Sequence, residues 1–324
     1  MHVYYRVYGL QLKANLEIPG LKSCEPVKEA VDVDVTMGRF PEKIVHLINQ
    51  EASPYYLEPG FEEKEPPHVV VTILSGGKYY YFNYDGTAQF VCDRQATVVW
   101  GNWQEPFVLE DAALYLLGPI LGFMLRLRGV TCLHASSVVV DGGALAITGQ
   151  SGTGKSTLAS ALAAEGYPVL TDDILPLMFD QGHVYALPGY PRIRLYPNTF
   201  QNIPDLPDDL PLLTPNWDKC FLDLDSGFYS FVNEPVPLRG VYLLDWSDDN
   251  TAVPEICPVK STAAVPLLAA NTYRNELLDM EMKKQEFYFL SRLVSYSFLR
   301  KVKPVDDIAE LHKLVEIIFN DFIE

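Results

Sequence analysis

Residues 149–156 are the segment whose residue types and spacing most directly indicate chemistry. They read Gly-Gln-Ser-Gly-Thr-Gly-Lys-Ser and match the phosphate-binding pattern G-x-x-x-x-G-K-[ST] at every fixed position. Glycines let such a loop curl tightly enough for its backbone N–H groups to surround phosphate oxygens. Lys155 would reach the β- and γ-phosphates, and the Ser156 hydroxyl would ligate Mg²⁺. The residues expected to bind the nucleotide are Gly149, Gln150, Ser151, Gly152, Thr153, Gly154, Lys155, Ser156 and Thr157.

The flanks of this loop supply the context that the pattern requires. Residues 144–148 form a short apolar run typical of a buried strand. Residues 157–165 are rich in alanine and leucine, as a helix should be, and Gly166 is a natural stop. A helix that begins at Lys155 directs its positive dipole end and free N–H groups at a bound anion. We therefore expect a nucleoside triphosphate site, with ATP and Mg²⁺ as ligands.

Two adjacent acids, Asp172 and Asp173, follow the next β-prone run, residues 167–171. A short strand–helix–strand unit returns parallel and right-handed, so this strand is expected beside the one before the loop, with both carboxyl ends on one edge. One acid can then hold Mg²⁺ while the other accepts a proton from an attacking hydroxyl. We assign Asp172 as the base and Asp173, with Ser156, as the metal partner; the reverse order and a solvated turn are the alternatives.

A histidine, His134, is expected at the mouth of the loop. Residues 133–140 are β-prone, residues 141–143 form a turn, and the strand into the loop follows. If Val140 faces Ala144, antiparallel pairing puts His134 opposite Gln150, and a slip of one residue leaves it at the loop. A solitary histidine is usually structural, but this register favours a role in phosphoryl transfer.

Two arginines, Arg192 and Arg194, are candidates for phosphate or substrate contacts. Residues two apart share one face of a strand, so both guanidinium groups could clamp an anionic group. Ordinary surface positions are the alternative. Lys219 is a further, weaker candidate for a phosphate contact.

Composition excludes several classes of partner. The chain has 324 residues and a net charge of −17, from 42 acidic and 25 basic residues. Nucleic acids and anionic membranes need a basic footprint, so neither is expected as a partner. The longest apolar window, residues 112–125, is shorter than the roughly 20 residues that span a bilayer and predicts a buried helix or helix pair. Five widely spaced cysteines favour no disulfide framework and a cytoplasmic location.

The order of the elements predicts two domains. Residues 1–105 read as a small β-rich domain, and residues 106–324 as an α/β domain that contains the loop. The final helix carries an apolar stripe that predicts core packing, with a homo-oligomer contact as the alternative. Its members are Ile308, Leu311, Leu314, Val315 and Ile318.

The segment LHASSVVVDGGALAITGQSGTGKSTLASALAAEGYPVLTDD, which carries His134, the loop and both acids, resembles the C-terminal catalytic domain of HPr kinase/phosphorylase. The segment PGYPRIRLYP is similar to the HPr-kinase-related serine kinases, a group that includes lasso-peptide precursor kinases. The resemblance implies a P-loop fold of the HPr kinase/PEP carboxykinase type, a divalent metal, and roles in phosphoryl transfer for His134 and Asp172. Thr157 replaces the usual glutamate, which argues against HPr itself as the substrate.

The function that these patterns favour is an ATP- and Mg²⁺-dependent kinase that phosphorylates a serine hydroxyl of a peptide or protein, such as a lasso-peptide precursor. Asp172, Asp173, His134 and Lys155 would carry the reaction. Two alternatives remain open at this stage. One is a nucleotide-binding regulatory or scaffold protein without transfer activity, and the other is a small-metabolite kinase.

Overall fold

The computed structural model describes residues 2–26, 30–50, 53–58, 68–201, 203, 205–246, 253–305 and 310–323. The chain divides into two compact units, Met1–Arg128 and Gly129–Glu324. The division therefore follows Arg128, not residue 105 as the sequence suggested. Residues 109–127 belong to the first unit because their aromatic rings pack on its sheet: Phe123 contacts Tyr80 and Phe82, and Tyr115 lies 4.3 Å from Tyr84 between ring centroids.

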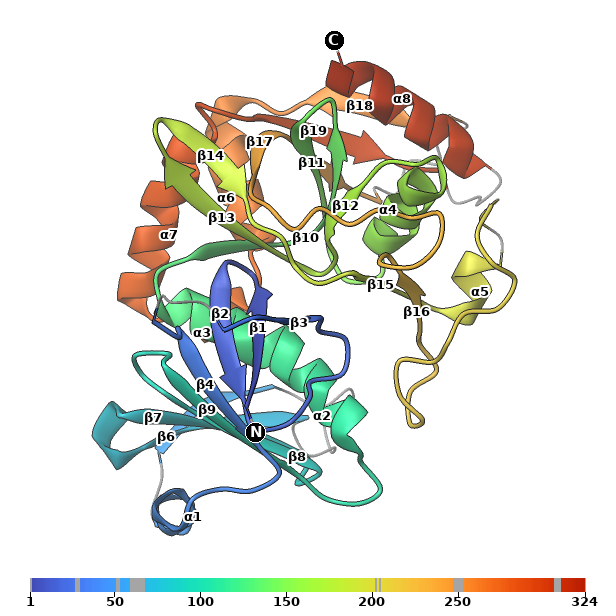
Figure 1. Ribbon diagram of the computed structural model, residues 1–324. Helices are drawn as coiled ribbons and strands as arrows, with labels where there is room; N and C mark the ends of the chain where they lie inside the picture. The colour runs from blue at the N-terminus through green and yellow to red at the C-terminus, as the bar shows by residue number, and fades with distance from the viewer. Residues whose placement is uncertain are drawn as a thin grey trace. The chain divides into compact units, whose positions relative to one another are not determined.

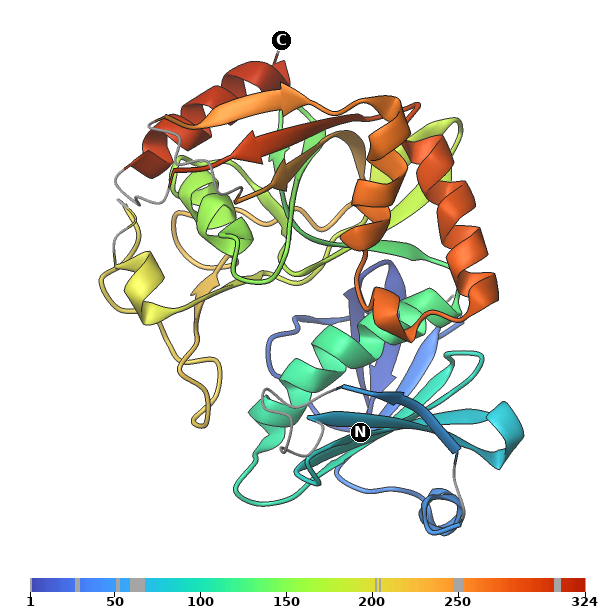
Figure 2. The same ribbon diagram turned by 180° about the vertical axis from the view of Figure 1, so that it is seen from behind.

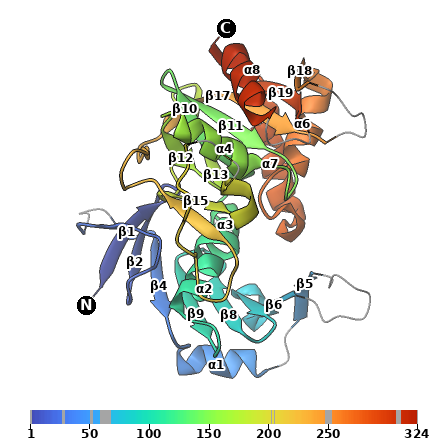
Figure 3. The ribbon, with the colours of Figure 1, turned by 90° about the vertical axis from the view of Figure 1, so that its right-hand side faces the viewer.

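The described part of the first unit contains a mixed sheet in the order β3-β1-β2-β4-β9-β8-β7-β6-β5 (Figure 3). Strand pairs β2–β4 and β4–β9 are parallel, and the others are antiparallel. The helical segment lies along this sheet (Figure 2) and is interrupted at Gly118 and Pro119. The elements are β1 (Val3–Val7), β2 (Leu10–Ala14), β3 (Ser23–Cys24), β4 (Val33–Met37), α1 (Glu42–Ile48), β5 (Ser53–Leu57), β6 (Val69–Leu74), η1 (Ser75–Gly77), β7 (Tyr79–Tyr84), β8 (Ala88–Asp93), β9 (Val98–Trp103), α2 (Leu109–Tyr115), η2 (Leu116–Ile120) and α3 (Leu121–Leu127).

The second unit is a mixed α/β structure built on two long strands (Figure 1). Strand β10 pairs with β11, β12 and β13, and β17 pairs with β11, β14 and β19. The elements are β10 (Thr131–Val140), β11 (Gly143–Thr148), α4 (Lys155–Ala164), β12 (Val169–Thr171), β13 (Ile174–Asp180), β14 (His183–Ala186), β15 (Arg192–Leu195), α5 (Pro197–Phe200), β16 (Cys220–Asp223), β17 (Val236–Leu244), β18 (Glu255–Pro258), α6 (Ser261–Ala270), η3 (Asn275–Leu277), α7 (Met280–Leu293), β19 (Phe298–Lys303) and α8 (Leu311–Ile323).

Strand β11 is buried on both faces, which explains the apolar run from Ala144 to Ile147 in its sequence. Leu145 and Ile147 pack in the core formed with α4 and α8, whereas Ala144 and Ala146 pack in the core formed with α6 and α7. These helices cover opposite faces of the sheet (Figure 2). Core packing of the final helix is confirmed for its buried residues Leu314, Val315 and Ile318, while Ile308 lies outside the described residues.

The strand before the acids does not lie where the sequence predicted. Strand β12 pairs with β10, at Ser137 opposite Thr171, and not with β11. The hairpin strand β10 occupies the predicted place, because it pairs with β11 on one side and with β12 on the other. Two antiparallel steps leave β12 parallel to β11, so the carboxyl ends of both strands still meet at one edge.

Within the described ranges, no helix is long and apolar enough to cross a membrane. All five cysteines are free in the structure.

Candidate active site

The glycine-rich loop, residues 149–156, connects β11 to α4 in the strand–loop–helix order that the sequence predicts. At Gly149 a Cβ atom would lie 2.8 Å from the backbone oxygen of Leu244, so a larger residue would displace the adjacent strand. Gly154 caps the helix with φ of 92°, a conformation that glycine adopts at little cost. The loop thus depends on glycine for both close packing and backbone shape.

Lys155 folds back onto its own loop. Its ammonium group donates to the backbone oxygens of Gly149 and Gln150, at 2.8 Å each. Burial lowers the pKa of Lys155, and the nearby charges of Asp173 and Asp172 oppose that shift. The lysine is therefore positioned at the loop but must exchange carbonyl contacts for phosphate oxygens if a nucleotide binds.

His134 lies beside the loop through a register that differs by one residue from the prediction. Val140 faces Gly143 rather than Ala144, and Ala135 faces Thr148, so the next pair places His134 opposite Gly149. The turn is a two-residue one at Asp141 and Gly142, whose φ values of 46° and 71° fit the type I′ turns that match strand twist. The sequence pattern predicts a three-residue turn here, so the hairpin is one residue tighter than predicted.

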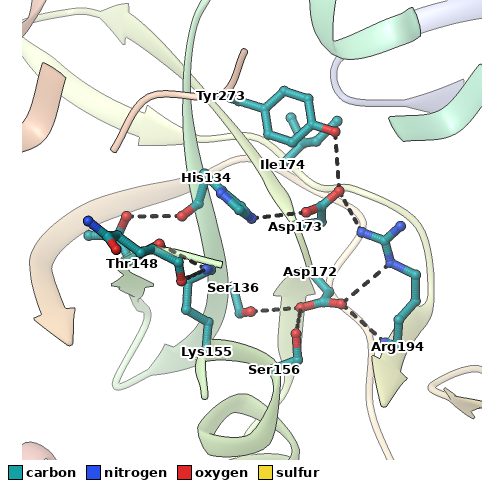
Figure 4. Close-up of polar contacts among 12 residues, drawn as sticks. His134, Ser136, Thr148, Lys155, Ser156, Asp172, Asp173, Ile174, Arg194 and Tyr273 are labelled. Carbon is teal, nitrogen blue, oxygen red and sulfur yellow. Dashed lines mark hydrogen bonds and ion pairs between the residues drawn. The ribbon is translucent and has the colours of Figure 1, made fainter. Parts of the chain in front are cut away.

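Asp172 is buried and contacts the loop serine (Figure 4). Its Oδ1 accepts hydrogen bonds from the Ser156 hydroxyl at 2.8 Å and the Ser136 hydroxyl at 2.7 Å. Its Oδ2 accepts one from the backbone N–H of Arg194 at 3.1 Å. The acid next to Ser156 is therefore Asp172, whereas the sequence led us to pair Ser156 with Asp173.

Asp173 turns toward the other side of the site (Figure 4). Its Oδ1 lies 3.2 Å from Nε2 of His134, and its Oδ2 lies 2.5 Å from a terminal nitrogen of Arg194. The Tyr273 hydroxyl donates to Oδ2 at 3.4 Å. The backbone of Asp173 has φ of 75°, which is uncommon outside glycine and sends consecutive carboxylates in different directions.

The charges around Asp173 determine its protonation. Burial alone would raise the pKa of Asp173, but the Arg194 guanidinium and the His134 imidazole hold it well below its usual range. Burial likewise works against the charge of Arg194, yet Asp173 raises the pKa of Arg194 well above its usual value. Both groups therefore stay charged, and Asp173 is an ionised acceptor near neutral pH.

The structure separates the two candidate arginines. The Arg194 guanidinium pairs with Asp173, and its Nε lies 3.9 Å from Oδ2 of Asp172. Arg192 instead stacks on the ring of Phe221, with 3.8 Å between its guanidinium carbon and the ring centroid. Arg192 pairs in register with Asp223 on β16. Of the pair predicted to form one clamp, only Arg194 faces the site.

Three cavities meet at the glycine-rich loop. The first, of about 280 Å³, is lined by most of the candidate residues. A second, of about 400 Å³, shares His134 and Asp173 with the first and extends to residues 270–276. A third, of about 220 Å³, lies against Thr157 and the start of α4. The candidate residues that line the first cavity are His134, Ser151, Gly152, Gly154, Lys155, Ser156, Thr157, Asp172, Asp173, Arg194 and Lys219.

Two further residues at this site, Ser136 and Tyr273, were not predicted from the sequence. Ser136 is two positions after His134 on β10, so strand periodicity could have indicated that it shares the face of the histidine. Tyr273 gave no local signal. It reaches the site because Thr272 bridges Leu133 and the N–H of Tyr273 bonds to the Cys132 backbone oxygen.

No protein-family model and no curated protein matches the sequence. Among solved structures, the chain is similar to the Hpr(Ser) kinase/phosphatase from Coxiella burnetii, with 14% sequence identity and a TM-score of 0.32. That alignment covers 59% of this chain and 96% of the other. The match is a distant structural neighbour, and a TM-score this low establishes neither family membership nor function.

Proposed function

We propose that this chain is an ATP- and Mg²⁺-dependent kinase that phosphorylates a serine hydroxyl of a peptide or protein. One observation carries the proposal: at a single cavity, adjacent acids contact two different partners. Asp172 contacts the loop serine Ser156, and Asp173 contacts His134. An acid at the metal side and an acid at the acceptor side are what a phosphoryl transfer needs. The resemblance to HPr-kinase-related serine kinases supports the same reaction, with a lasso-peptide precursor as one class of acceptor.

The residues present fit a magnesium ion shared with phosphate oxygens. The Ser156 hydroxyl and the Asp172 carboxylate are oxygen ligands 2.8 Å apart, and Mg²⁺ typically takes one or two protein oxygens plus phosphates and water. Among the described residues there is no cluster of three or more His, Cys, Asp or Glu that could hold a metal by itself. We propose Ser156 and Asp172 as the ligands, reversing the expected order of the acids. Bound Mg²⁺ would neutralise charge on the phosphates.

Asp173 and His134 would serve the acceptor. The ionised carboxylate of Asp173 can accept a hydrogen bond from the incoming hydroxyl, and the adjacent imidazole can share the proton that leaves. Arg194 fixes the Asp173 carboxylate from the opposite side. For a loose transition state the protein mainly positions the reactants and neutralises charge. Lys155 would add to that neutralisation once its ammonium group leaves the loop carbonyls.

The second cavity suits the acceptor. It lies on the side of His134 and Asp173, next to Gly149 and Ser151 at the beginning of the loop. Its volume of about 400 Å³ lies in the range of small-ligand pockets. Arg274 on its wall is paired with Glu276 at 2.9 Å, and Asp173 is paired with Arg194. Such compensated charges favour an uncharged hydroxyl over an anionic metabolite.

The test is transfer of labelled phosphate from ATP to serine peptides, including lasso-peptide precursors, with and without Mg²⁺. The proposal expects Mg²⁺-dependent phosphoserine that disappears in Asp173→Asn while ATP binding persists. The matched control is Asp223→Asn on β16, which pairs in register with Arg192. ATP binding without transfer to any peptide would favour the scaffold alternative, and unchanged turnover in Asp173→Asn would reject the assigned site.

A further inference from the structure

The third cavity has a different chemistry from the other two. Its volume is about 220 Å³, and its walls come from the loop, α4, the end of β17 and the start of α8. Among the described residues that line it, only Glu310 is ionisable. The apolar side chains on its walls are Leu158, Leu244, Trp246, Pro304, Val305, Leu311 and Leu314.

This third cavity adjoins the first cavity at the first turn of α4. Gly152, Gly154 and Thr157 line both cavities. A ligand whose phosphates lie over the loop would therefore place its other end in an apolar space. The second cavity, at the opposite end of the loop, is left for the acceptor.

Trp246 provides a flat wall at this position. Its side chain is 45% exposed, and its indole N–H donates to the backbone oxygen of Thr153 at 3.1 Å. The hydrogen bond attaches the ring to the loop while part of its surface faces the cavity. An exposed aromatic ring fixed beside a phosphate site is suited to stacking on a base.

We infer that the third cavity holds the nucleobase of the triphosphate, stacked on Trp246; this inference rests on the proposed function. Stacking on Trp246 rewards a flat ring whichever base carries it, because every base has a π-face. The ligand class is therefore nucleoside triphosphates in general, with ATP and GTP bound within about tenfold of each other.

The experiment is calorimetric titration of the full chain, in Mg²⁺, with ATP, GTP and inorganic tripolyphosphate. Wild type is expected to bind both nucleotides more tightly than tripolyphosphate. Trp246→Ala is expected to lower the affinity for ATP by about five- to a hundredfold, the range for losing one base–aromatic stack. The affinity for tripolyphosphate should stay unchanged. Trp246→Phe keeps a ring without the N–H and should retain most of the ATP affinity. Phe228→Ala, at a 73% exposed ring outside the cavity, is the matched control.

The outcomes separate this inference from the proposed function. ATP affinity unaffected in Trp246→Ala but lost in Lys155→Ala would overturn the base site and leave the nucleotide site intact. An equal loss of ATP and tripolyphosphate affinity in Trp246→Ala would also overturn it, because Trp246 would then act only through the loop. Failure of wild type to bind either ligand would reject both proposals. Discrimination of ATP from GTP by a thousandfold would overturn the inferred ligand class.

Discussion

The glycine-rich loop and the acid cluster beside it, defined as His134, Asp172, Asp173 and Arg194, are built in different ways. The loop is one contiguous segment whose lysine contacts its own backbone carbonyls. The cluster brings together side chains from β10, the turn after β12 and β15, and its members contact one another through charge. The loop therefore depends on backbone geometry, whereas the cluster depends on electrostatic balance. Substitution of one loop residue should therefore disable phosphate binding by the loop. A change of charge or pH should instead disturb the contacts within the acid cluster.

The largest effect is expected from Lys155→Ala, which removes the cation of the loop. We expect a loss of transfer of about a thousandfold or more, because a preorganised charge at the reacting phosphate is removed. Steady-state kinetics with labelled ATP measures it. Lys219→Ala, at a cation of the same cavity but outside the loop, is the control and should lose far less. Equal losses in the two variants would contradict the special position of Lys155.

The next effect tests the charge balance of the cluster. Arg194→Met leaves Asp173 buried without its guanidinium partner and is expected to cost about 3 kcal/mol in the free energy of unfolding at pH 7. Urea denaturation measures this change. Arg192→Met, two residues along the same strand but stacked on Phe221, is the matched control and should cost less. Equal costs would show that the Arg194–Asp173 pair does not stabilise the cluster.

The stability difference between wild type and Arg194→Met should also depend on pH. The folded pKa of Asp173 lies below its unfolded value of about 3.9, so its stabilising contribution is present above about pH 4 and is lost as the pH falls further. Arg194→Met removes the main favourable charge, and burial then raises the pKa of Asp173. The difference in unfolding free energy between wild type and variant should therefore shrink from pH 7 to pH 3. A difference that stays constant would contradict the account.

A comparison of the two acids sharpens the division between metal side and acceptor side. Asp172→Asn should raise the Mg²⁺ concentration needed for half-maximal nucleotide binding by about ten- to a hundredfold, because it weakens a proposed ligand. Asp173→Asn should leave that concentration nearly unchanged while reducing transfer. Titration of Mg²⁺ against a fluorescent ATP analogue measures both. The reverse result would restore the order of roles first expected from the sequence.

The smallest effect is expected from Tyr273→Phe. The hydroxyl makes a long hydrogen bond of 3.4 Å to Asp173, while the ring packs edge-on against His134 at 5.7 Å between centroids. Loss of the hydroxyl should lower transfer by no more than about tenfold, since a typical hydrogen bond contributes about 1 kcal/mol. Tyr273→Ala removes the ring contact too and should lower transfer further, measured by the same kinetics.

The contrast between loop and cluster also explains what the sequence could predict. The loop was recognisable because its residues and both flanks are contiguous. The proximity of the two acids to the loop could be predicted from strand order. It holds although β12 pairs with β10 and not with β11, because two successive antiparallel pairings leave β12 parallel to β11. The direction of each carboxylate could not be predicted, since it depends on the positive φ of Asp173. Tyr273 comes from a segment 100 residues after Asp173 in the chain, so no local pattern announces it.

The most direct test of the central claim is a crystal structure with Mg²⁺ and a non-hydrolysable ATP analogue. The account predicts phosphates over residues 149–156, the metal at Ser156 and Asp172, and Asp173 still beside His134 and Arg194. A metal held by Asp173 away from Ser156, or a nucleotide bound elsewhere on the chain, would contradict it.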